Sequence, residues 1–259
     1  MKNPISSRPP TERFTGRVEA YRRYRSRFPR EIISVLQQRC GLSPNSIVAD
    51  IGAGTGMFAE LFLENGNTVF AVEPNAEMRA ACEELSSRYP TLTCIDGTAE
   101  TTGLPDHSID FIAVGRAFHW FDREKCRPEF LRILRPRGWV VIASSGPRRG
   151  PDGILHDHER LLREHGIDYT QLRDRYRVDD SVREFFAGSE PQEVDFDDAE
   201  NLTYEEFEGH TLSLSVTPQP GHPKFPAFQR ALREYFNRYQ SGGRITLPTR
   251  CRVVFAQLP

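Results

Sequence analysis

Ser46-Ile47-Val48-Ala49-Asp50-Ile51-Gly52-Ala53-Gly54-Thr55-Gly56 is the stretch of the chain that decides the fold. Its first part is apolar and β-branched and runs into three alternating glycines, which predicts a buried strand followed by a tight turn. From Met57 to Asn65 apolar residues recur at helical spacing, and Gly66 is placed to end that helix. Strand, glycine turn and helix together open a nucleotide-binding βαβ unit, in which glycine lets the backbone approach a ligand closely.

The residues around the glycines indicate which nucleotide is bound. Met57 stands where a dinucleotide fingerprint has its third glycine. Asp50 comes two residues before the first glycine, and we expect its carboxylate at the mouth of the site, where it would repel a pyrophosphate. S-adenosylmethionine (SAM) carries a sulfonium, an ammonium and no phosphate. The stretch from Val48 to Gly56 resembles the first motif of class I SAM-dependent methyltransferases; the alternative is a glycine turn that binds nothing.

This resemblance implies an α/β fold with a Rossmann-like, doubly wound sheet of seven strands. The strand order would be 3-2-1-4-5-7-6, with the last strand antiparallel. Residues 1–40 would form an N-terminal helical lid segment and residues 41–146 the SAM-binding Rossmann-like core. Residues 147–259 would supply an acceptor-site insert and the C-terminal strands that complete the sheet. The resemblance covers about residues 13–146 in motifs and the rest only in layout.

The second predicted strand, Thr68 to Val72, ends at Glu73. An acid there, about 20 residues after the glycine turn, can accept hydrogen bonds from both ribose hydroxyls. Dehydrogenases share this feature, and a solvated acid at a strand end is the alternative. Asn75 is expected to cap a helix that continues through Ser87.

The segment from Asp96 to Glu100, with Leu104-Pro105 after it, resembles the family segment that holds the adenine edge. The family often has Asp where this chain has Thr98, so another group must accept from the adenine amino group. The cofactor-binding residues that the resemblance implies are Tyr21, Arg25, Asp50, Gly52, Ala53, Gly54, Gly56, Glu73, Pro74, Met78, Thr98, Ala99, Glu100, Gly115 and Arg116.

A fourth strand, Ile109 to Gly115, leads into the aromatic string Arg116 to Asp122. Ligands bind at the carboxyl ends of strands in such sheets, and the string resembles a trans-aconitate-type branch of the family. We expect at least one of its aromatics to pack in the core. His119 is the predicted catalytic base, the alternative being a structural histidine. The predicted substrate-binding residues are Phe118, His119, Trp120 and Arg148.

Residues 13–30 are basic and aromatic. They are expected to form either an amphipathic helix with a solvated basic face or a lid over the cofactor. In the family branches that the segment resembles, the trans-aconitate type and the ubiquinone/menaquinone type, an aromatic and an arginine approach the methionine end of SAM. Arg25 would bind its carboxylate in a bidentate contact.

Further along the chain, Asp122 is expected to cap a helix that Pro128 interrupts or restarts. A fifth strand is predicted at 139–142, an edge strand near 194–196, a helix at 204–214, an amphipathic helix at 228–239 and a last strand at 250–256. His156 and His158 are only two residues apart, so no metal site is predicted.

Net charge, cysteine content and the length of apolar runs exclude several classes of protein. The net charge is −2, which gives no basic field for nucleic acid. Five scattered cysteines fit a reduced interior, and no apolar run is long enough for a membrane span. We expect a soluble cytoplasmic monomer or homodimer that contacts neither nucleic acid nor membrane.

The predicted function is methyl transfer from SAM to a small-molecule acceptor, with S-adenosylhomocysteine as the product. The arginines of the first segment, with Arg148 and Arg149, would favour an anionic or phenolic acceptor. The alternatives are a nicotinamide-dependent Rossmann dehydrogenase, which Asp50 and Met57 disfavour, and a SAM-fold binding protein without catalysis.

Overall fold

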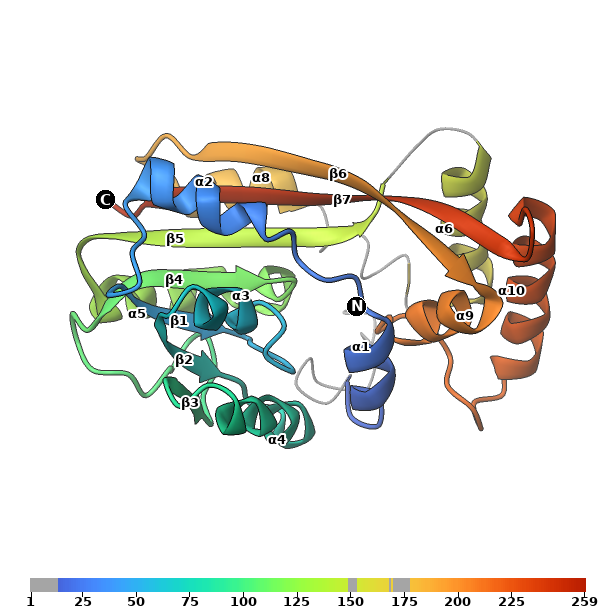
Figure 1. The fold of residues 1–259 in the computed structure, drawn as a ribbon, viewed down its shortest axis with the longest axis horizontal. Coiled ribbons are helices and arrows are strands. Elements are labelled where there is room, and N and C mark those ends of the chain that lie inside the picture. Colours follow the sequence, from blue (N-terminus) through green and yellow to red (C-terminus); the bar gives the residue numbers. More distant parts are fainter. Residues whose placement is uncertain (1–13, 149–152, 168, 170–177) are drawn as a thin grey trace, which may run out of the picture. The chain divides into compact units, whose positions relative to one another are not determined.

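The computed structural model describes residues 14–148, 153–167, 169 and 178–259. Within these residues lies a seven-stranded sheet of order β3-β2-β1-β4-β5-β7-β6, in which β7 runs opposite to both neighbours (Figure 1). The predicted α/β fold, strand order and antiparallel last strand are therefore confirmed. The strands are β1 (Ile47–Ile51), β2 (Thr68–Val72), β3 (Leu92–Ile95), β4 (Ile109–Gly115), β5 (Leu134–Pro147), β6 (Gln192–Thr203) and β7 (Arg244–Gln257).

The helices follow the predicted pattern with shifted ends. They are α1 (Val18–Tyr24), α2 (Glu31–Cys40), α3 (Ala59–Glu64), α4 (Ala76–Glu83), α5 (Arg123–Ile133), α6 (Gly153–His165), α8 (Val178–Phe185), α9 (Tyr204–Leu212) and α10 (Phe225–Tyr239), with short 3₁₀ turns η2 (Glu84–Ser87) and η3 (Phe118–Trp120). Two predicted caps are confirmed: Asn75 accepts from Met78 N–H at the start of α4, and Asp122 accepts from Lys125 N–H at the start of α5. Gly41 ends α2 in the left-handed conformation, with φ of 72°.

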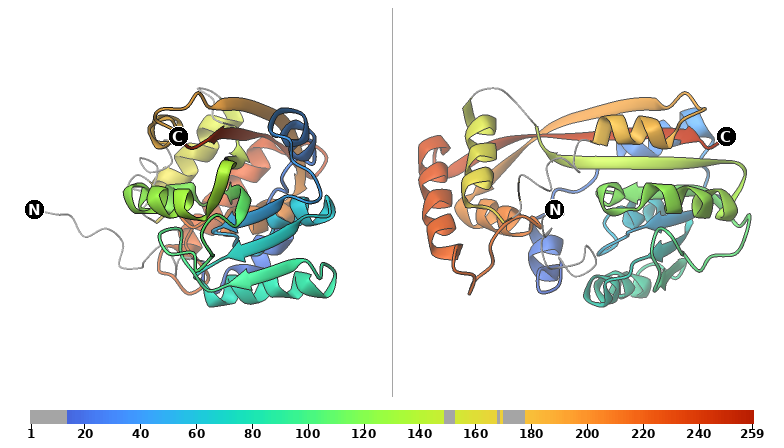
Figure 2. Two further views of the ribbon diagram at one scale, coloured as in Figure 1. Left: turned by 90° about the vertical axis from the view of Figure 1, so that its left-hand side faces the viewer. Right: turned by 180° about the vertical axis from the view of Figure 1, so that it is seen from behind.

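β1 is the centre of the parallel part of the sheet, because it pairs with β2 on one side and β4 on the other. Its residues alternate between two apolar clusters: Val48 packs with residues of α2 and α3, and Ala49 with residues of α5 and α8. Figures 1 and 2 show these two helix pairs on opposite faces of the sheet. Both faces are covered, as a doubly wound parallel sheet requires.

The expectation that Pro128 would interrupt a helix is wrong. Pro128 lies inside the continuous helix α5. A proline there removes one backbone donor, but Cys126, Phe130 and Ile133 of the same helix are fully buried against the sheet. That packing outweighs the loss of one intrahelical hydrogen bond.

The last three strands are longer than their apolar patterns predict. On β6 and β7, charged pairs extend the strands: Asp195 accepts from Arg252 at 3.0 Å, and Asp197 accepts from Arg250 at 2.6 and 3.0 Å. Alternation of acid and base across two antiparallel strands stabilises their register without adding hydrophobicity. The pattern of apolar residues alone therefore underestimates these strands.

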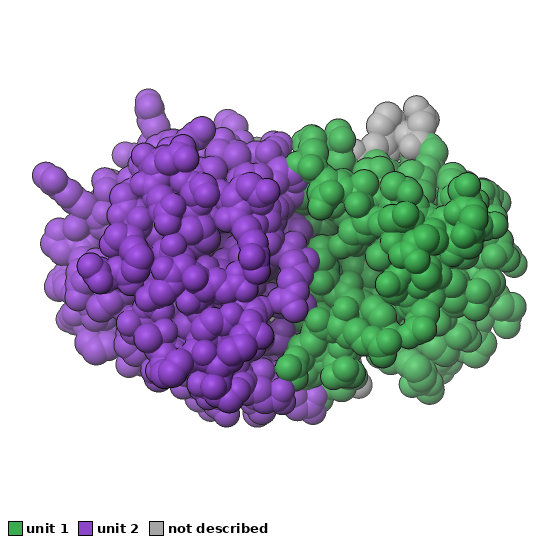
Figure 3. Space-filling model, in the orientation of Figure 1, with its two compact units in different colours: residues 1–26, 146–176, 197–250 green, residues 27–145, 177–196, 251–259 purple. Residues whose placement is uncertain are grey.

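The chain divides into two compact units, coloured separately in Figure 3. Unit 1 contains residues 1–26, 146–176 and 197–250, and unit 2 contains residues 27–145, 177–196 and 251–259. The glycine turn and strands β1 to β4 belong to unit 2. Each unit is built from separate pieces of the sequence.

In unit 1, the N-terminal helix α1 packs closely on α9. A Cβ on Gly209 would lie 2.3 Å from the ring of Tyr24, so only glycine permits this approach. Arg17, 7% exposed, donates to the carbonyls of Leu212 and Thr217, at 3.0 and 2.9 Å. These two contacts tie this part of the basic segment to α9 and to the loop that follows it.

Candidate functional site

The glycine turn of unit 2 is fixed to the end of β2. Gly52 and Ala53 donate to the carbonyl of Val72 at 2.8 and 3.2 Å. Gly52, Gly54 and Gly56 have φ values of 70°, 57° and 82°, which glycine adopts without strain. A Cβ on Gly52 would lie 2.6 Å from that of Ala117, whereas one on Gly54 would meet nothing within 4 Å. Gly54 thus presents bare backbone to open space.

Asp50 does not lie at the mouth of the site, as we expected, but is fully buried. Its Oδ2 accepts from the N–H of Ala59, the first residue of α3, at 2.9 Å. Its Oδ1 is buried and has no hydrogen-bond partner within the described part of the chain. Burial, reinforced by the charge of Glu73, raises the pKa of Asp50 to about 7 although the bond from Ala59 opposes the shift. The Asp50 carboxylate therefore fixes the start of α3, after the glycine turn, from inside the core.

Glu73 is brought to the glycine turn, as the sequence predicted. Its Oε2 accepts from Gly54 N–H at 2.8 Å and its Oε1 from Asn75 N–H at 2.9 Å. Burial raises its pKa, while those two bonds and the charge of Arg79 act in the opposite direction. Each carboxylate oxygen keeps a second lone pair for another donor. Met78, on the first turns of α4, is buried, and Pro74 is half-buried.

The predicted adenine segment forms a tight turn. Thr98 and Thr101 exchange backbone hydrogen bonds of 3.0 and 3.2 Å. Ala99 is buried between them, and Glu100 Oε1 accepts from Asp122 N–H at 2.8 Å. The side chain of Glu100 is thus engaged with the start of α5.

Arg79 is a residue that the sequence did not point to. Its guanidinium donates to the carbonyl of Glu73 at 2.8 Å and to Asp96 at 3.2 Å. It therefore joins the end of β2 to the start of the adenine segment. An arginine in the first turns of a helix is common, so the sequence carried no signal for this bridge.

The carboxyl end of β4 is also tightly packed. A Cβ on Gly115 would lie 2.8 Å from Phe58 and 2.9 Å from Phe28. Arg116 follows in a left-handed conformation, with φ of 57°, an uncommon state for a residue with a side chain. Its guanidinium lies 4.4 Å from the centre of the Phe28 ring and donates to the Met57 sulfur. Arg116 thereby contacts both Phe28 and Met57, the residue that directly follows the glycine turn.

The aromatic residues that follow β4 differ in how deeply they are buried. Phe118 is 3% exposed and packs edge-on against Phe121 and Phe185. Phe118 is a core residue, which confirms that at least one aromatic of the string packs in the core, and its predicted role in substrate binding stays a prediction. His119 and Trp120 are half-buried, with ring centres 4.5 Å apart. Their predicted roles towards an acceptor remain predictions.

The remaining predicted site residues belong to unit 1. The Arg25 guanidinium lies 5.3 Å from the centre of the Tyr21 ring. Arg148 lies 3.7 Å from Asp197, which also binds Arg250. Arg149 lies outside the described residues. The cofactor role of Tyr21 and Arg25 and the substrate role of Arg148 therefore stay predictions.

The residues of unit 2 fit SAM. Glu73 and the backbone of Gly54 lie together, which suits a ribose. Apart from Gly54 and its two chain neighbours, no atom of the described residues lies within 4 Å of where a Cβ on Gly54 would be. Across the described ranges, no group of three or more His, Cys, Asp and Glu side chains is placed to hold a metal ion. None of the described helices combines the length and hydrophobicity needed to cross a membrane.

Comparison with known proteins agrees with this geometry. Residues 49–142 match a family described as "Methyltransferase domain". An uncharacterized methyltransferase of Mycobacterium tuberculosis is 38% identical over 125 residues, which cover 48% of this chain and 49% of the relative. Another, from Geobacillus kaustophilus, is 32% identical over 144 residues, which cover 53% and 64%. The chain thus spans about half the length of the first of these curated relatives.

Solved structures share the fold. A candidate type II methyltransferase from Anaeromyxobacter dehalogenans has a TM-score of 0.64 at 22% identity, covering 91% of this chain and 98% of that one. A SAM-dependent methyltransferase from Geobacter sulfurreducens, in complex with S-adenosyl-L-homocysteine, has a TM-score of 0.53 at 17% identity, covering 95% and 98%. At such identities the similarity establishes the architecture.

Proposed function

We propose that this chain transfers a methyl group from SAM to a small-molecule acceptor, because residues 49–142 match a family described as "Methyltransferase domain". The observation that carries the proposal is the contact between Glu73 and the glycine turn, with Glu73 Oε2 2.8 Å from the Gly54 nitrogen. This contact brings Glu73, the proposed ribose acceptor, and the unobstructed backbone of Gly54 together at the carboxyl ends of β1 and β2. Open parallel sheets bind their ligands at these ends.

The residues proposed to hold SAM divide by the part of the molecule they face. Glu73 accepts the ribose hydroxyls, the turn from Thr98 to Glu100 meets the adenine edge, and Gly52 to Gly54 lie under the adenosine. Tyr21 and Arg25 are proposed for the methionine end, within an N-terminal lid. When bound, SAM supplies an electrophilic methyl group on a sulfonium.

The chain's own contribution to the reaction is orientation and the exclusion of water. Methyl transfer is an in-line displacement, so a rigid pocket that aligns the acceptor lowers the barrier. We propose that His119 takes the proton of an acceptor that must be deprotonated. Trp120, whose ring lies beside His119, is proposed to line the acceptor site and to favour the sulfonium through its π face.

A small anionic or phenolic acceptor is the class we propose. Support comes from the arginine-rich N-terminal segment, although Arg17 and Arg23 are used in contacts to α9 and its following loop. Arg148 shares Asp197 with Arg250, so the three side chains together keep a net positive charge. An anion or a phenol is favoured over a cation beside such a group.

Binding experiments test the cofactor. The protein is titrated calorimetrically with SAM, S-adenosylhomocysteine and NAD. We expect both adenosyl ligands to bind and NAD to bind far more weakly, since Met57 stands where a dinucleotide fingerprint has its third glycine. Preferential binding of NAD would favour the dehydrogenase alternative.

Product analysis tests catalysis. The protein is incubated with SAM carrying a deuterated methyl group and a panel of carboxylic acids and phenols. Mass spectrometry should detect a labelled product in step with S-adenosylhomocysteine release. Adenosyl-ligand binding without a labelled product from acids, phenols, amines or thiols would favour a non-catalytic binding protein.

A further inference from the structure

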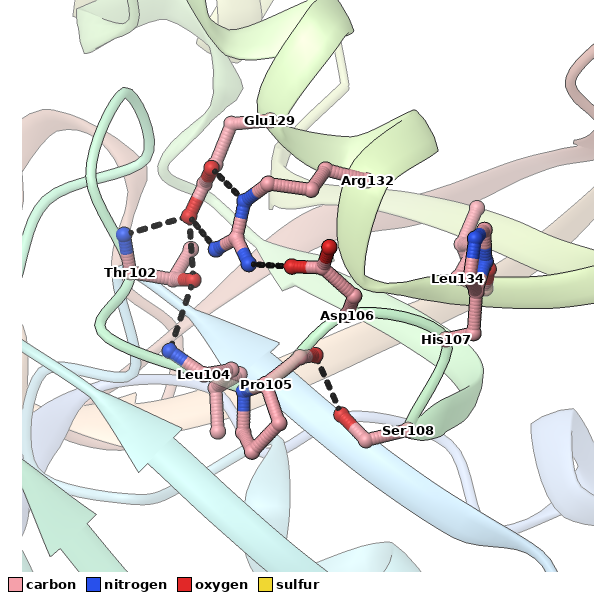
Figure 4. A network of polar contacts seen from close by, with 9 residues as sticks. All are labelled: Thr102, Leu104, Pro105, Asp106, His107, Ser108, Glu129, Arg132 and Leu134. Carbon is pink, nitrogen blue, oxygen red and sulfur yellow. Dashed lines mark hydrogen bonds and ion pairs between the residues drawn. The ribbon is translucent and has the colours of Figure 1, made fainter.

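The loop between β3 and β4 is anchored to α5 by one half-buried carboxylate, that of Glu129. Glu129 Oε1 accepts from the backbone N–H of Thr102 at 2.8 Å and from its hydroxyl at 2.5 Å (Figure 4). Thr102 is fully buried, and its hydroxyl oxygen accepts in turn from Leu104 N–H at 3.2 Å. A single side chain therefore satisfies two buried donors of the loop.

Arg132 holds Glu129 in place from the next turn of α5. Its guanidinium makes a bidentate contact to Glu129, at 2.8 and 2.7 Å, and a third bond to Asp106 at 2.5 Å. The Arg132 guanidinium, followed by the bonds from Thr102, lowers the pKa of Glu129 to about 2 despite partial burial. The carboxylate is ionised at neutral pH, so its bonds to Thr102 are charge-assisted and strong.

Thr102 lies two residues beyond Glu100, the last residue of the turn proposed to meet adenine. That turn closes through the exchange of backbone bonds between Thr98 and Thr101. The Thr102 carbonyl also lies 2.8 Å from the position of a Cβ on Gly97, so the start of the segment packs directly on Thr102. A displacement of Thr102 would shift both ends of the turn.

We propose that Glu129 is a positioning residue for the cofactor: through Thr102 it fixes the turn from Thr98 to Glu100 against the adenine edge. This inference rests on the proposed SAM-binding function. Glu129 is held away from the ligand by Thr102, so it acts on the cofactor only through the loop. Asp96, the Thr98 hydroxyl and the backbone are the groups that could accept from the adenine amino group, and all of them lie in the segment that packs on Thr102.

Two substitutions separate positioning from general stability. Glu129→Ala leaves two buried donors of Thr102 without an acceptor. Glu129→Gln keeps one amide oxygen for Thr102 but turns an amide N–H₂ towards Arg132. Glu64→Gln is the matched control, because Glu64 is also a helical glutamate bonded to an arginine, Arg30, and makes no contact with the loop. Thermal melts establish that each variant is folded.

The ligands are S-adenosylhomocysteine and its analogue with hydrogen in place of the adenine amino group. We expect Glu129→Ala to weaken S-adenosylhomocysteine binding by about tenfold and the analogue by no more than about twofold, because the lost contact is to the amino group. Glu129→Gln should lose less than Glu129→Ala, since Thr102 keeps an acceptor. Glu64→Gln should match the wild type with both ligands.

Three results would overturn the inference. Wild-type affinity in folded Glu129→Ala shows that the loop needs no anchor. Equal weakening of both ligands assigns Glu129 a general structural role. Equal affinity of the wild type for both ligands shows that the protein makes no contact with the adenine amino group that contributes to binding. Failure of the wild type to bind S-adenosylhomocysteine is a different outcome, because it overturns the proposed function and the inference falls with it.

Discussion

At the scale of single residues, Glu73 is the group on which we propose that cofactor binding depends. Glu73→Ala should weaken S-adenosylhomocysteine binding by about 1.5–3 kcal/mol, the range for hydrogen bonds to a charged acceptor. Calorimetric titration measures the loss. Glu83→Ala, which replaces an exposed acid at the end of α4, is the control and should bind as the wild type does. Unchanged affinity in Glu73→Ala would remove the ribose role.

His119 is predicted to act on the acceptor and not on the cofactor. His119→Ala should lower turnover by about 10²-fold or more, the usual contribution of a general base, while S-adenosylhomocysteine affinity stays within about twofold. Single-turnover rates and calorimetry on the same preparation test the two halves separately. Loss of S-adenosylhomocysteine binding in His119→Ala would show that His119 has a structural role. Wild-type turnover would show that His119 takes no part in the reaction.

Several single residues were predictable because their signals are local. Glu73 follows a strand, Asn75 and Asp122 precede helices, and the glycines stand in a known turn. Asp50 was placed wrongly because sequence spacing gives a position along the strand and not its depth. Phe118 was assigned to the substrate because an aromatic after a strand has the same pattern whether it packs inwards or faces a ligand.

At the scale of elements, the contact between α1 and α9 holds the N-terminal segment in place. Arg17→Ala would remove a buried donor to the carbonyls of Leu212, Leu214 and Thr217. The first two carbonyls keep a bond from the Thr217 hydroxyl, so the cost of about 1–3 kcal/mol for an unsatisfied buried acceptor falls on the Thr217 carbonyl. We expect faster amide exchange across α1 and the end of α9. Hydrogen exchange with mass spectrometry measures both peptides, and peptides of α4 serve as the internal control.

A second variant tests the same contact from the other side. Gly209→Ala places a Cβ 2.3 Å from the Tyr24 ring, so α1 must move away. It should raise exchange in α1 as Arg17→Ala does. If both variants leave α1 protected, the segment is held by other contacts and this explanation is wrong.

The strands and helices differ in how much the sequence revealed. β2 and β4 have the predicted bounds, because their apolar runs end in polar or glycine residues on both sides. β5, β6 and β7 exceed their apolar cores, since cross-strand charge pairs extend β6 and β7. The Arg17 contact spans 195 residues of sequence, and no local pattern encodes a partner at that distance.

At the scale of the whole molecule, two buried groups give the units opposite responses to pH. In unit 2, the pKa of Asp50 is raised from 3.8 to about 7, so its contribution to stability is fully present below pH 3.8 and is lost as pH rises through about 7. In unit 1, burial lowers the pKa of His158 from 6.5 to about 4, so its contribution is present above pH 6.5 and is lost as pH falls through about 4.

Lowering the pH from 7 to 5 should therefore loosen unit 1 and tighten unit 2. Hydrogen exchange at both pH values, corrected for the intrinsic rate, reports each unit through its own peptides. Asp50→Asn should abolish the response of unit 2 and His158→Phe that of unit 1, because neither replacement titrates in this range. Parallel changes in both units would contradict the assignment.

The division of the chain also determines when each unit can be completed during synthesis. Unit 1 needs residues up to 250, and unit 2 needs residues from 251 onwards, so the pieces of both are separated by nearly the whole sequence. Neither can finish folding while β7 is still inside the ribosome, although β1 to β4 emerge early. The nascent chain must carry a partly covered sheet until then, which makes it a substrate for chaperones.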